Sequence, residues 1–290
     1  MSTTFAVARR GRSRTARRRR RIDLMAGTVL AILTFVGLFP YLFMLFTSFK
    51  TNNQFYKSYW APTLPLHFSN YGSAARQIAP YLLTSVIVAA TATIGAVSLG
   101  ALTAYVLSRY RFPGRLVFFA LIAVLMMVPG IASLIPLFIL MRSLGLLNSL
   151  PVLILPAITG GLILAVILIK TFIDQLPQEV FEAAQIDGAT GPRMFFSLML
   201  PLARPIIGTV ALMNVIAVWS EYFWPELTVT TNSLRTIPVG LQFFQGQNVT
   251  SYGPMFAGFI LASLPLLVLF VFLSKYFLAG LQGGIPGSQL

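Results

Sequence analysis

Six long apolar runs divide the 290-residue sequence, and they constrain its fold more than any other feature. Each run has about 20 residues that are almost free of charge, the length at which an α-helix crosses a hydrocarbon core of about 30 Å. Only helices and closed barrels satisfy the backbone in lipid, and long runs without alternation predict helices. We therefore predict an all-α membrane protein with six transmembrane helices. The runs cover approximately residues 24–47, 80–107, 116–140, 150–169, 205–224 and 254–274.

The distribution of charge supports this class. Charged residues make up 10% of the chain, whereas soluble domains carry about 25%. Nine of the 21 basic residues lie between Arg9 and Arg21, directly before the first run. Polybasic segments beside a membrane helix stay in the cytoplasm and attract anionic lipid. No stacking platform or basic groove accompanies this segment, so we expect residues 1–23 to be a cytoplasmic anchor and expect no nucleic-acid partner.

The basic residues also predict the topology. With the N-terminus inside, the inner segments hold 16 Lys and Arg residues and the outer segments hold five. The positive-inside rule therefore predicts that both termini are cytoplasmic. The first run is too long for a signal-peptide core and lacks a clear cleavage site, so we expect it to be retained. The transmembrane domain then comprises residues 24–274, with a cytoplasmic loop at 170–204 and a cytoplasmic tail at 275–290.

The sequence lacks the residue sets of common catalytic and metal sites. It has no cysteine, which excludes disulfides and thiolate metal sites. Its single histidine, His67, has no acidic neighbour, so neither a metal site nor a Ser-His-Asp set is expected. No Gly-x-x-x-x-Gly-Lys-Ser/Thr phosphate loop occurs. We predict that the chain is not an enzyme and binds no metal or cofactor.

The predicted cytoplasmic loop holds four of the seven acidic residues, between Asp174 and Asp187. Pro177 suits the first position of a helix, and Gly188 suits a left-handed residue that ends one. Thr190 can cap a second short helix. A helix of about ten residues is marginal by itself, so it needs a partner. A groove on another protein and the lipid headgroups are both open as that partner.

Within the loop, "EAAQIDGATGPRMFFSLMLP" fits the pattern E-A-A, three residues, G, nine residues, a hydrophobic residue, one residue, L-P. It resembles the cytoplasmic signature loop of permease subunits in binding-protein-dependent ABC importers. Nearly the whole chain resembles the carbohydrate-importer branch, and within it the second permease of the maltose type. The stretches that carry this likeness are "FPYLFMLFTSFK", "LTAYVLSRYRFPGR", "VPGIASLIPLFILMRSLGLLNS" and "VWSEYFWPEL".

The resemblance implies a type I ABC importer permease fold in the bacterial cytoplasmic membrane. It implies that residues 177–188 form a coupling helix in a cleft of an ATPase subunit, with Glu182 facing a basic ATPase residue. The partners would be a second homologous permease, a dimer of ATPase subunits that hold ATP and Mg²⁺, and a substrate-binding lipoprotein. The tail "GLQGGIPGSQL" lacks the lysine common in the family. The resemblance implies ATPase-coupling roles for Glu182, Ala183, Ala184, Asp187, Gly188, Leu200 and Pro201.

The apolar runs also bear on the substrate, because their hydrophobic cores contain no Asp, Glu, Lys or Arg, and Glu221 lies only near the outer end of the fifth run. Proton- and ion-coupled carriers place ionisable groups there, so an ATP-independent secondary carrier is disfavoured. The lack of a basic side chain at mid-membrane favours a neutral ligand. Together with the resemblance, this predicts import of a neutral mono-, di- or oligosaccharide. A polyol, a glycerol phosphoester or a peptide remains an alternative on the same scaffold.

Polar and aromatic residues near the outer end of the fifth run are candidates for a substrate path. Asn214 and Glu221 are seven residues apart and would share one helix face. The aromatic residues beside them fit either a sugar path or an aromatic belt at the lipid interface. Prolines and glycines also interrupt the third and fourth runs, which indicates kinks, close packing or ligand contact. The path candidates are Asn214, Trp219, Ser220, Glu221, Tyr222 and Phe223.

Overall fold

The computed structural model describes residues 4–244 and 250–282, and every regular element in this part of the chain is a helix. The predicted all-α class is thereby confirmed. The last eight residues of the predicted tail lie outside the described residues. The α-helices are α1 (Thr4–Ser48), α2 (Asn52–Lys57), α3 (Ser69–Arg109), α4 (Arg115–Leu125), α5 (Gly130–Ser143), α6 (Leu150–Asp174), α7 (Gln178–Ile186), α8 (Gly191–Met194), α9 (Leu200–Leu202), α10 (Arg204–Ser220), α11 (Phe223–Thr228), α12 (Ile237–Gly240) and α13 (Tyr252–Gln282).

Three short helices of other types complete the list: a π-helix η1 (Phe195–Met199) and two 3₁₀ helices, η2 (Asn232–Leu234) and η3 (Leu241–Phe244).

Four described helices, α1, α3, α6 and α13, are long and apolar enough to cross a membrane. Two further spans arise only if bent pairs are counted as one span each. The first pair joins α4 to α5 at 98°, and the second joins the segment Gly191–Leu202 to α10 at 76°. The sequence predicted six spans, and the structure has between four and six by length and composition.

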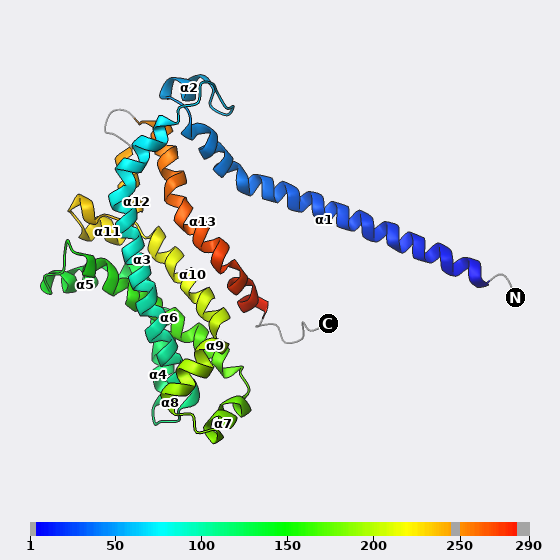
Figure 1. The fold of residues 1–290 in the computed structure, drawn as a ribbon, viewed down its shortest axis with the longest axis vertical. Helices are drawn as coiled ribbons and strands as arrows, with labels where there is room; N and C mark the ends of the chain where they lie inside the picture. Colours follow the sequence, from blue (N-terminus) through cyan, green and yellow to red (C-terminus); the bar gives the residue numbers. More distant parts are fainter. Residues whose placement is uncertain (1–3, 245–249, 283–290) are drawn as a thin grey trace.

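The long helix α3 lies at the centre of the bundle, against α6, α10 and α13 (Figure 1). Its buried face carries small residues three or four positions apart, which lets neighbouring helices approach closely. Helix packing in lipid relies on such close contact, because apolar burial against lipid tails provides little net drive. The small buried residues are Ala89, Ala92, Ala96, Gly100 and Ala104.

The first helix behaves differently from the bundle. Figure 1 shows α1 leaving the bundle beside α13 and extending away from it. The most apolar window of its membrane-length part, Asp23–Ser48, has no buried residue. Large apolar side chains such as Leu30 and Phe35 are more than half exposed. This surface must be covered by lipid or by another protein, because exposed apolar area of this extent is unfavourable in water.

The breaks predicted in the third and fourth runs have different outcomes. The third run is broken, since α4 ends at Leu125 and Pro129 stands in extended conformation before α5. The fourth run is not interrupted, because α6 continues through Pro156 and both of its central glycines. One of these, Gly161, is needed for packing: a Cβ there would lie 1.8 Å from Nδ2 of Asn214 on α10.

The two ends of the bundle carry different short helices. In Figure 1, α2 and α12 lie toward one end of α3, and α7 to α9 lie at the other end. At the α2 end, Lys50 is 1% exposed, and its ammonium donates to the carbonyl oxygens of Ser58 (2.8 Å) and Tyr59 (3.2 Å). Burial lowers the pKa of Lys50. A buried cation held by carbonyls ties the turn after α1 to the segment after α2.

Candidate functional site

The predicted coupling helix is present as α7, over Gln178–Ile186. Pro177 precedes the helix as its cap residue, one position earlier than expected. Gly188 has a φ of 79°, which confirms the predicted left-handed end. Its N–H donates to the carbonyl oxygen of Gln185 at 3.0 Å, which satisfies one of the last carbonyls of the helix.

One face of α7 is buried and the other is open. Phe181 is buried, whereas Glu179 and Glu182 are exposed. The amide of Gln178 donates to the Glu182 carboxylate at 2.7 Å, one helical turn away. Ile186 is 87% exposed, which is unusual for a residue of this kind. The open face therefore combines acidic groups with apolar surface, as a protein-docking face does.

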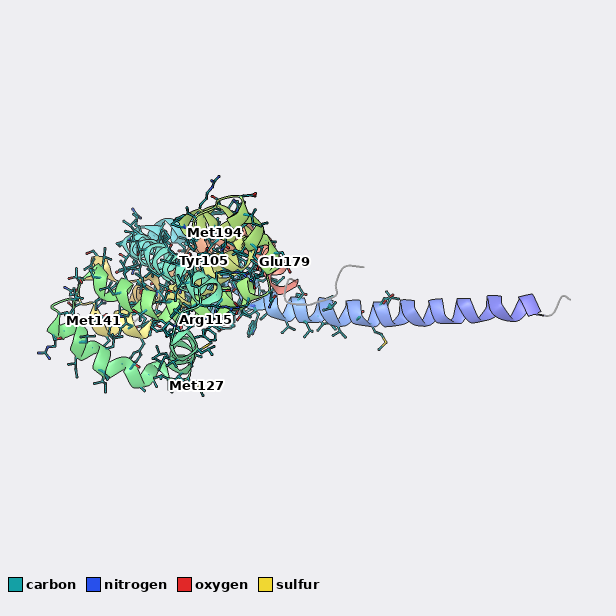
Figure 2. The ribbon with its side chains drawn as sticks, turned by 90° about the horizontal axis from the view of Figure 1, so that it is seen from below. Tyr105, Arg115, Met127, Met141, Glu179 and Met194 are labelled. Carbon is teal, nitrogen blue, oxygen red and sulfur yellow. The ribbon has the colours of Figure 1, made fainter. Side chains whose placement is uncertain are left out.

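The buried face of α7 rests on a cluster at the same end of the bundle. Phe181 belongs to a core formed by the ends of α3 and α6 and by the segment that leads into α10. Figure 2, seen from this end, shows Tyr105 beside Met194, and both line one cleft with Arg115. The cleft between α7 and the end of α3 has a volume of about 710 Å³. It provides open space beside the acidic residue Glu182.

The segment after α7 is irregular. Thr190 stands at the predicted cap position of α8, but its side chain makes no capping hydrogen bond. Helix α8 ends after four residues, and the π-helix η1 follows. Pro201 lies in the first turn of α9 and Pro205 in the first turn of α10, on either side of the 76° bend. π-helical turns are frequent at functional sites. Because of the bend, the segment Gly191–Leu202 packs beneath the buried face of α7, whereas α10 runs back into the bundle.

The structure distributes the seven predicted coupling residues over two layers. The exposed layer on and after α7 contains the two acidic residues and can contact another protein directly. The second layer is half-buried, and its Ala184 and Leu200 pack against the cluster under α7. The exposed residues are Glu182, Ala183, Asp187 and Gly188, and the half-buried ones are Ala184, Leu200 and Pro201.

Polar contacts that the sequence did not predict connect the same end of the bundle. Asp174, the last residue of α6, accepts a hydrogen bond from Ser108 on α3 at 2.6 Å and pairs with Lys170 one turn before it. The Lys170 ammonium also lies 4.6 Å from the centre of the Phe119 ring on α4. The spacing of Lys170 and Asp174 indicates a pair on one helix, but their partners on α3 and α4 depend on helix crossings.

The substrate-path candidates are not brought together. Asn214 is buried and accepts a hydrogen bond from Thr93 at 2.9 Å, inside the bundle. Glu221 was expected on the same helix face, and this was wrong, because α10 ends at Ser220 and Glu221 has extended backbone. The Glu221 carboxylate accepts a hydrogen bond from the backbone N–H of Trp224 at 3.1 Å, which satisfies one of the free N–H groups in the first turn of α11.

The other path candidates lie around this turn with different exposure. Trp219 is buried in the bundle, and Tyr222 is half-buried. Ser220 and Phe223 are exposed. The sequence signal for the turn was Pro225, which stands in α11 and has no N–H to donate within a continuing helix.

A family model described as the inner membrane component of binding-protein-dependent transport systems matches residues 96–282. The match includes α7, the cleft and the bend. This chain belongs to that family. The membership confirms the prediction made from the signature loop, a permease subunit of the carbohydrate-importer branch of ABC transporters. Members are multi-pass subunits of the cytoplasmic membrane and are not enzymes themselves.

Similar proteins cover almost the whole chain. The diacetylchitobiose uptake system permease NgcG of Streptomyces coelicolor is 34% identical over 258 residues, 87% of this chain and 84% of that protein. The trehalose/maltose permease MalG of Thermococcus litoralis is 31% identical over 269 residues, which are 91% of this chain and 96% of that protein. A crystal structure of a bacterial alginate ABC importer has a TM-score of 0.74 at 22% identity, over 89% of this chain and 97% of that one. This last likeness establishes the type I permease fold.

Proposed function

We propose that this permease moves a neutral mono-, di- or oligosaccharide across the cytoplasmic membrane, driven by ATP that separate subunits hydrolyse. The single observation that carries the coupling is α7. This short helix has one buried residue, an exposed acidic face and an exposed Ile186, on an end of the bundle away from α2. A nine-residue helix with this exposed face is poorly stable alone and is well suited to a groove on an ATPase subunit.

The proposed topology has six spans, with the bent pairs α4–α5 and α8–α10 each counted as one. Both termini and the loop with α7 are then cytoplasmic. The excess of Lys and Arg on that side supports this orientation. The end of the bundle with α2 and α12 is outside, where a substrate-binding lipoprotein would dock. ATP and Mg²⁺ would be held by the ATPase subunits.

The proposed assembly contains a second, homologous permease, most simply as a heterodimer. The exposed apolar surface of α1 supports the proposal of a protein partner in the membrane, because the bundle leaves that helix uncovered. In such an assembly the substrate path would lie between the two permeases. Glu182 and Asp187, both exposed, would contact the ATPase.

The substrate class rests on two observations. NgcG and MalG carry the names of diacetylchitobiose and of trehalose and maltose, which are uncharged sugars. The central apolar stretches of the described membrane helices contain no Asp, Glu, Lys or Arg, which favours a neutral ligand. A charged saccharide is the second candidate, because the structurally similar alginate importer handles an acidic polysaccharide.

The test is transport by the reconstituted complex. The permease would be purified with its partner permease and ATPase subunits, placed in proteoliposomes and supplied with the binding protein. We expect uptake of a neutral saccharide only when ATP and the loaded binding protein are both present. Uptake without ATP would contradict the proposal and support a secondary carrier. A binding protein that prefers acidic saccharides, peptides or phosphoesters would contradict only the proposal that the substrate is neutral, and not the proposal of ATP-driven import.

A further inference from the structure

The stretch "LTAYVLSRYRFPGR" at the end of α3 contains Arg109, whose side chain joins three helices. Its Nη2 donates to the carbonyl oxygens of Ile173 (2.8 Å) and Leu176 (3.3 Å), at the end of α6. Its guanidinium carbon lies 3.7 Å from the centre of the Phe181 ring on α7. One residue of α3 therefore contacts both the end of α6 and the proposed coupling helix.

These contacts use properties that only arginine combines. The last carbonyls of a helix lack intrahelical partners, and a cation near them is favourable. A planar guanidinium can donate in its plane to such carbonyls while its face lies on an aromatic ring. Lysine has a single ammonium and cannot provide both contacts with the same geometry. Asp174, the nearest acidic residue of α6, is engaged by Lys170 and Ser108.

The contact with Phe181 decides how α7 is held. Phe181 is the one buried residue among the nine of α7, all of which the structure describes. A helix this short does not fix its own position. Its direction relative to the bundle therefore depends on the surface against which Phe181 packs, and Arg109 forms part of that surface.

The helix that carries Arg109 continues to the opposite end of the bundle. There the hydroxyl of Tyr81 donates to the side chain of Asn232 at 2.9 Å. The hydroxyl of Thr84 donates to the carbonyl oxygen of Ser233 at 3.0 Å. Thus α3 contacts α7 at one end and the segment around η2 at the other. A continuous helix with both contacts can carry a displacement between them.

We propose that Arg109 is a positioning residue that transmits movement of α7 to the ends of α3 and α6 during transport. This inference rests on the proposed function, in which an ATPase subunit acts on α7. Loss of Arg109 leaves α7 in place through the burial of Phe181 but removes its fixed connection to α3. ATP hydrolysis is then less well converted into transport.

The test compares Arg109→Gln, Arg109→Lys and Phe181→Leu with the control Arg111→Gln in the reconstituted complex. Arg111 lines the same cleft and is exposed, so the control removes the same charge without removing the α6 and α7 contacts described above. The measurements are saccharide molecules transported per ATP hydrolysed, stimulation of ATP hydrolysis by the loaded binding protein, and retention of the ATPase subunits on purification.

We expect the transport ratio and the stimulation to fall about tenfold in both Arg109 variants, because hydrogen bonds from a charged donor and a cation–π contact are lost. Phe181→Leu keeps an apolar side chain at this position but removes the aromatic ring that Arg109 contacts, so its transport ratio should fall by the same factor. Arg111→Gln should stay within about twofold of the unaltered chain. If Arg109 had only a structural role, its variants would retain less of the ATPase subunits on purification, but each intact complex would transport the same number of saccharide molecules per ATP hydrolysed.

The outcomes separate this inference from the proposed function. If the unaltered complex transports without ATP or without a binding protein, the proposed function fails. If the unaltered complex is a coupled importer and all three variants keep its transport ratio, the inference about Arg109 is overturned. If Arg109→Gln does not assemble, Arg109→Lys and Phe181→Leu decide: normal ratios in both overturn it, and reduced ratios support it.

Discussion

Gly188 determines where α7 ends, and it is the one residue of the coupling loop 170–204 with a positive φ. Its φ of 79° costs a residue with a Cβ about 1 kcal/mol or more. No atom lies within 4 Å of an added Cβ, so the cost is backbone strain without a collision. We predict that Gly188→Val lowers binding-protein-stimulated ATP hydrolysis several-fold or more, since about 1.4 kcal/mol corresponds to tenfold.

The chain offers a matched control for this prediction. Gly145, between α5 and α6, has a φ of 68° and is equally open. Gly145→Val should carry similar strain and a similar loss of thermal stability, yet leave stimulation intact. Gly188→Asn should recover part of the activity, because Asn tolerates the left-handed region better than Val. Equal stimulation in Gly188→Val and the unaltered chain would show that this turn does not set the coupling geometry.

Asn214 raises a different question at the residue scale, namely whether it contacts substrate or only packs. Its bond from Thr93 and its contact with Gly161 place it within the bundle. We predict that Thr93→Val costs about 1–3 kcal/mol of stability, because it leaves a buried amide oxygen without its donor. Adding Asn214→Ala should recover part of that loss. Thermal unfolding of the two single variants and the double variant measures these stability changes. If every Asn214 variant of normal stability instead shows a large rise in the KM for uptake, Asn214 contacts the substrate.

At the scale of elements, the sequence predicted the existence of the helices better than their ends. Runs of apolar residues indicate membrane helices because lipid offers the backbone no other partner. The position of α7 and its end at Gly188 followed from proline and glycine chemistry, which is local. The break before Gly130 and the exit of Glu221 from α10 were less predictable, since prolines are also tolerated inside membrane helices, as Pro156 in α6 is.

The same distinction holds for the candidate site. The signature residues could be found from their spacing along the chain, because they lie on one continuous loop. The contact of Arg109 with Phe181 joins residues far apart in sequence and depends on how α3, α6 and α7 cross. No local pattern reports a crossing. Hydropathy also gave no indication that Asn214 would be buried against Gly161 and not exposed to a path.

The exposed face of α7 carries a prediction of its own. Burying an isoleucine that is 87% exposed contributes about 1.5–3 kcal/mol to a docked interface. Ile186→Ser should therefore weaken binding of the ATPase subunit about tenfold or more, as measured by subunit retention or direct titration in detergent. Ile131→Ser on α5, where the side chain is 75% exposed, is the control for loss of apolar surface. Equal retention in both variants would favour a helix that lies at the lipid headgroups.

At the scale of the whole molecule, the positions of the short helices give the orientation a direct test. The α2 end and the α7 end lie apart along α3 (Figure 1). Lys57 on α2 and Gln185 on α7 are both exposed. The chain has no cysteine, so a single introduced cysteine reports one position without background. The proposed topology places Lys57 outside and Gln185 in the cytoplasm.

We predict that an impermeant maleimide labels Lys57→Cys on intact cells and labels Gln185→Cys only in permeabilised cells or inverted vesicles. The excess of basic residues on the α7 side is the physical reason, because Lys and Arg are retained in the cytoplasm during insertion. Bound ATPase should also protect Gln185→Cys from the reagent in inverted vesicles, and washing the ATPase away should restore labelling. Labelling of Gln185→Cys from outside intact cells would reverse the topology and, with it, the assignment of α7 as the element on which the ATPase acts.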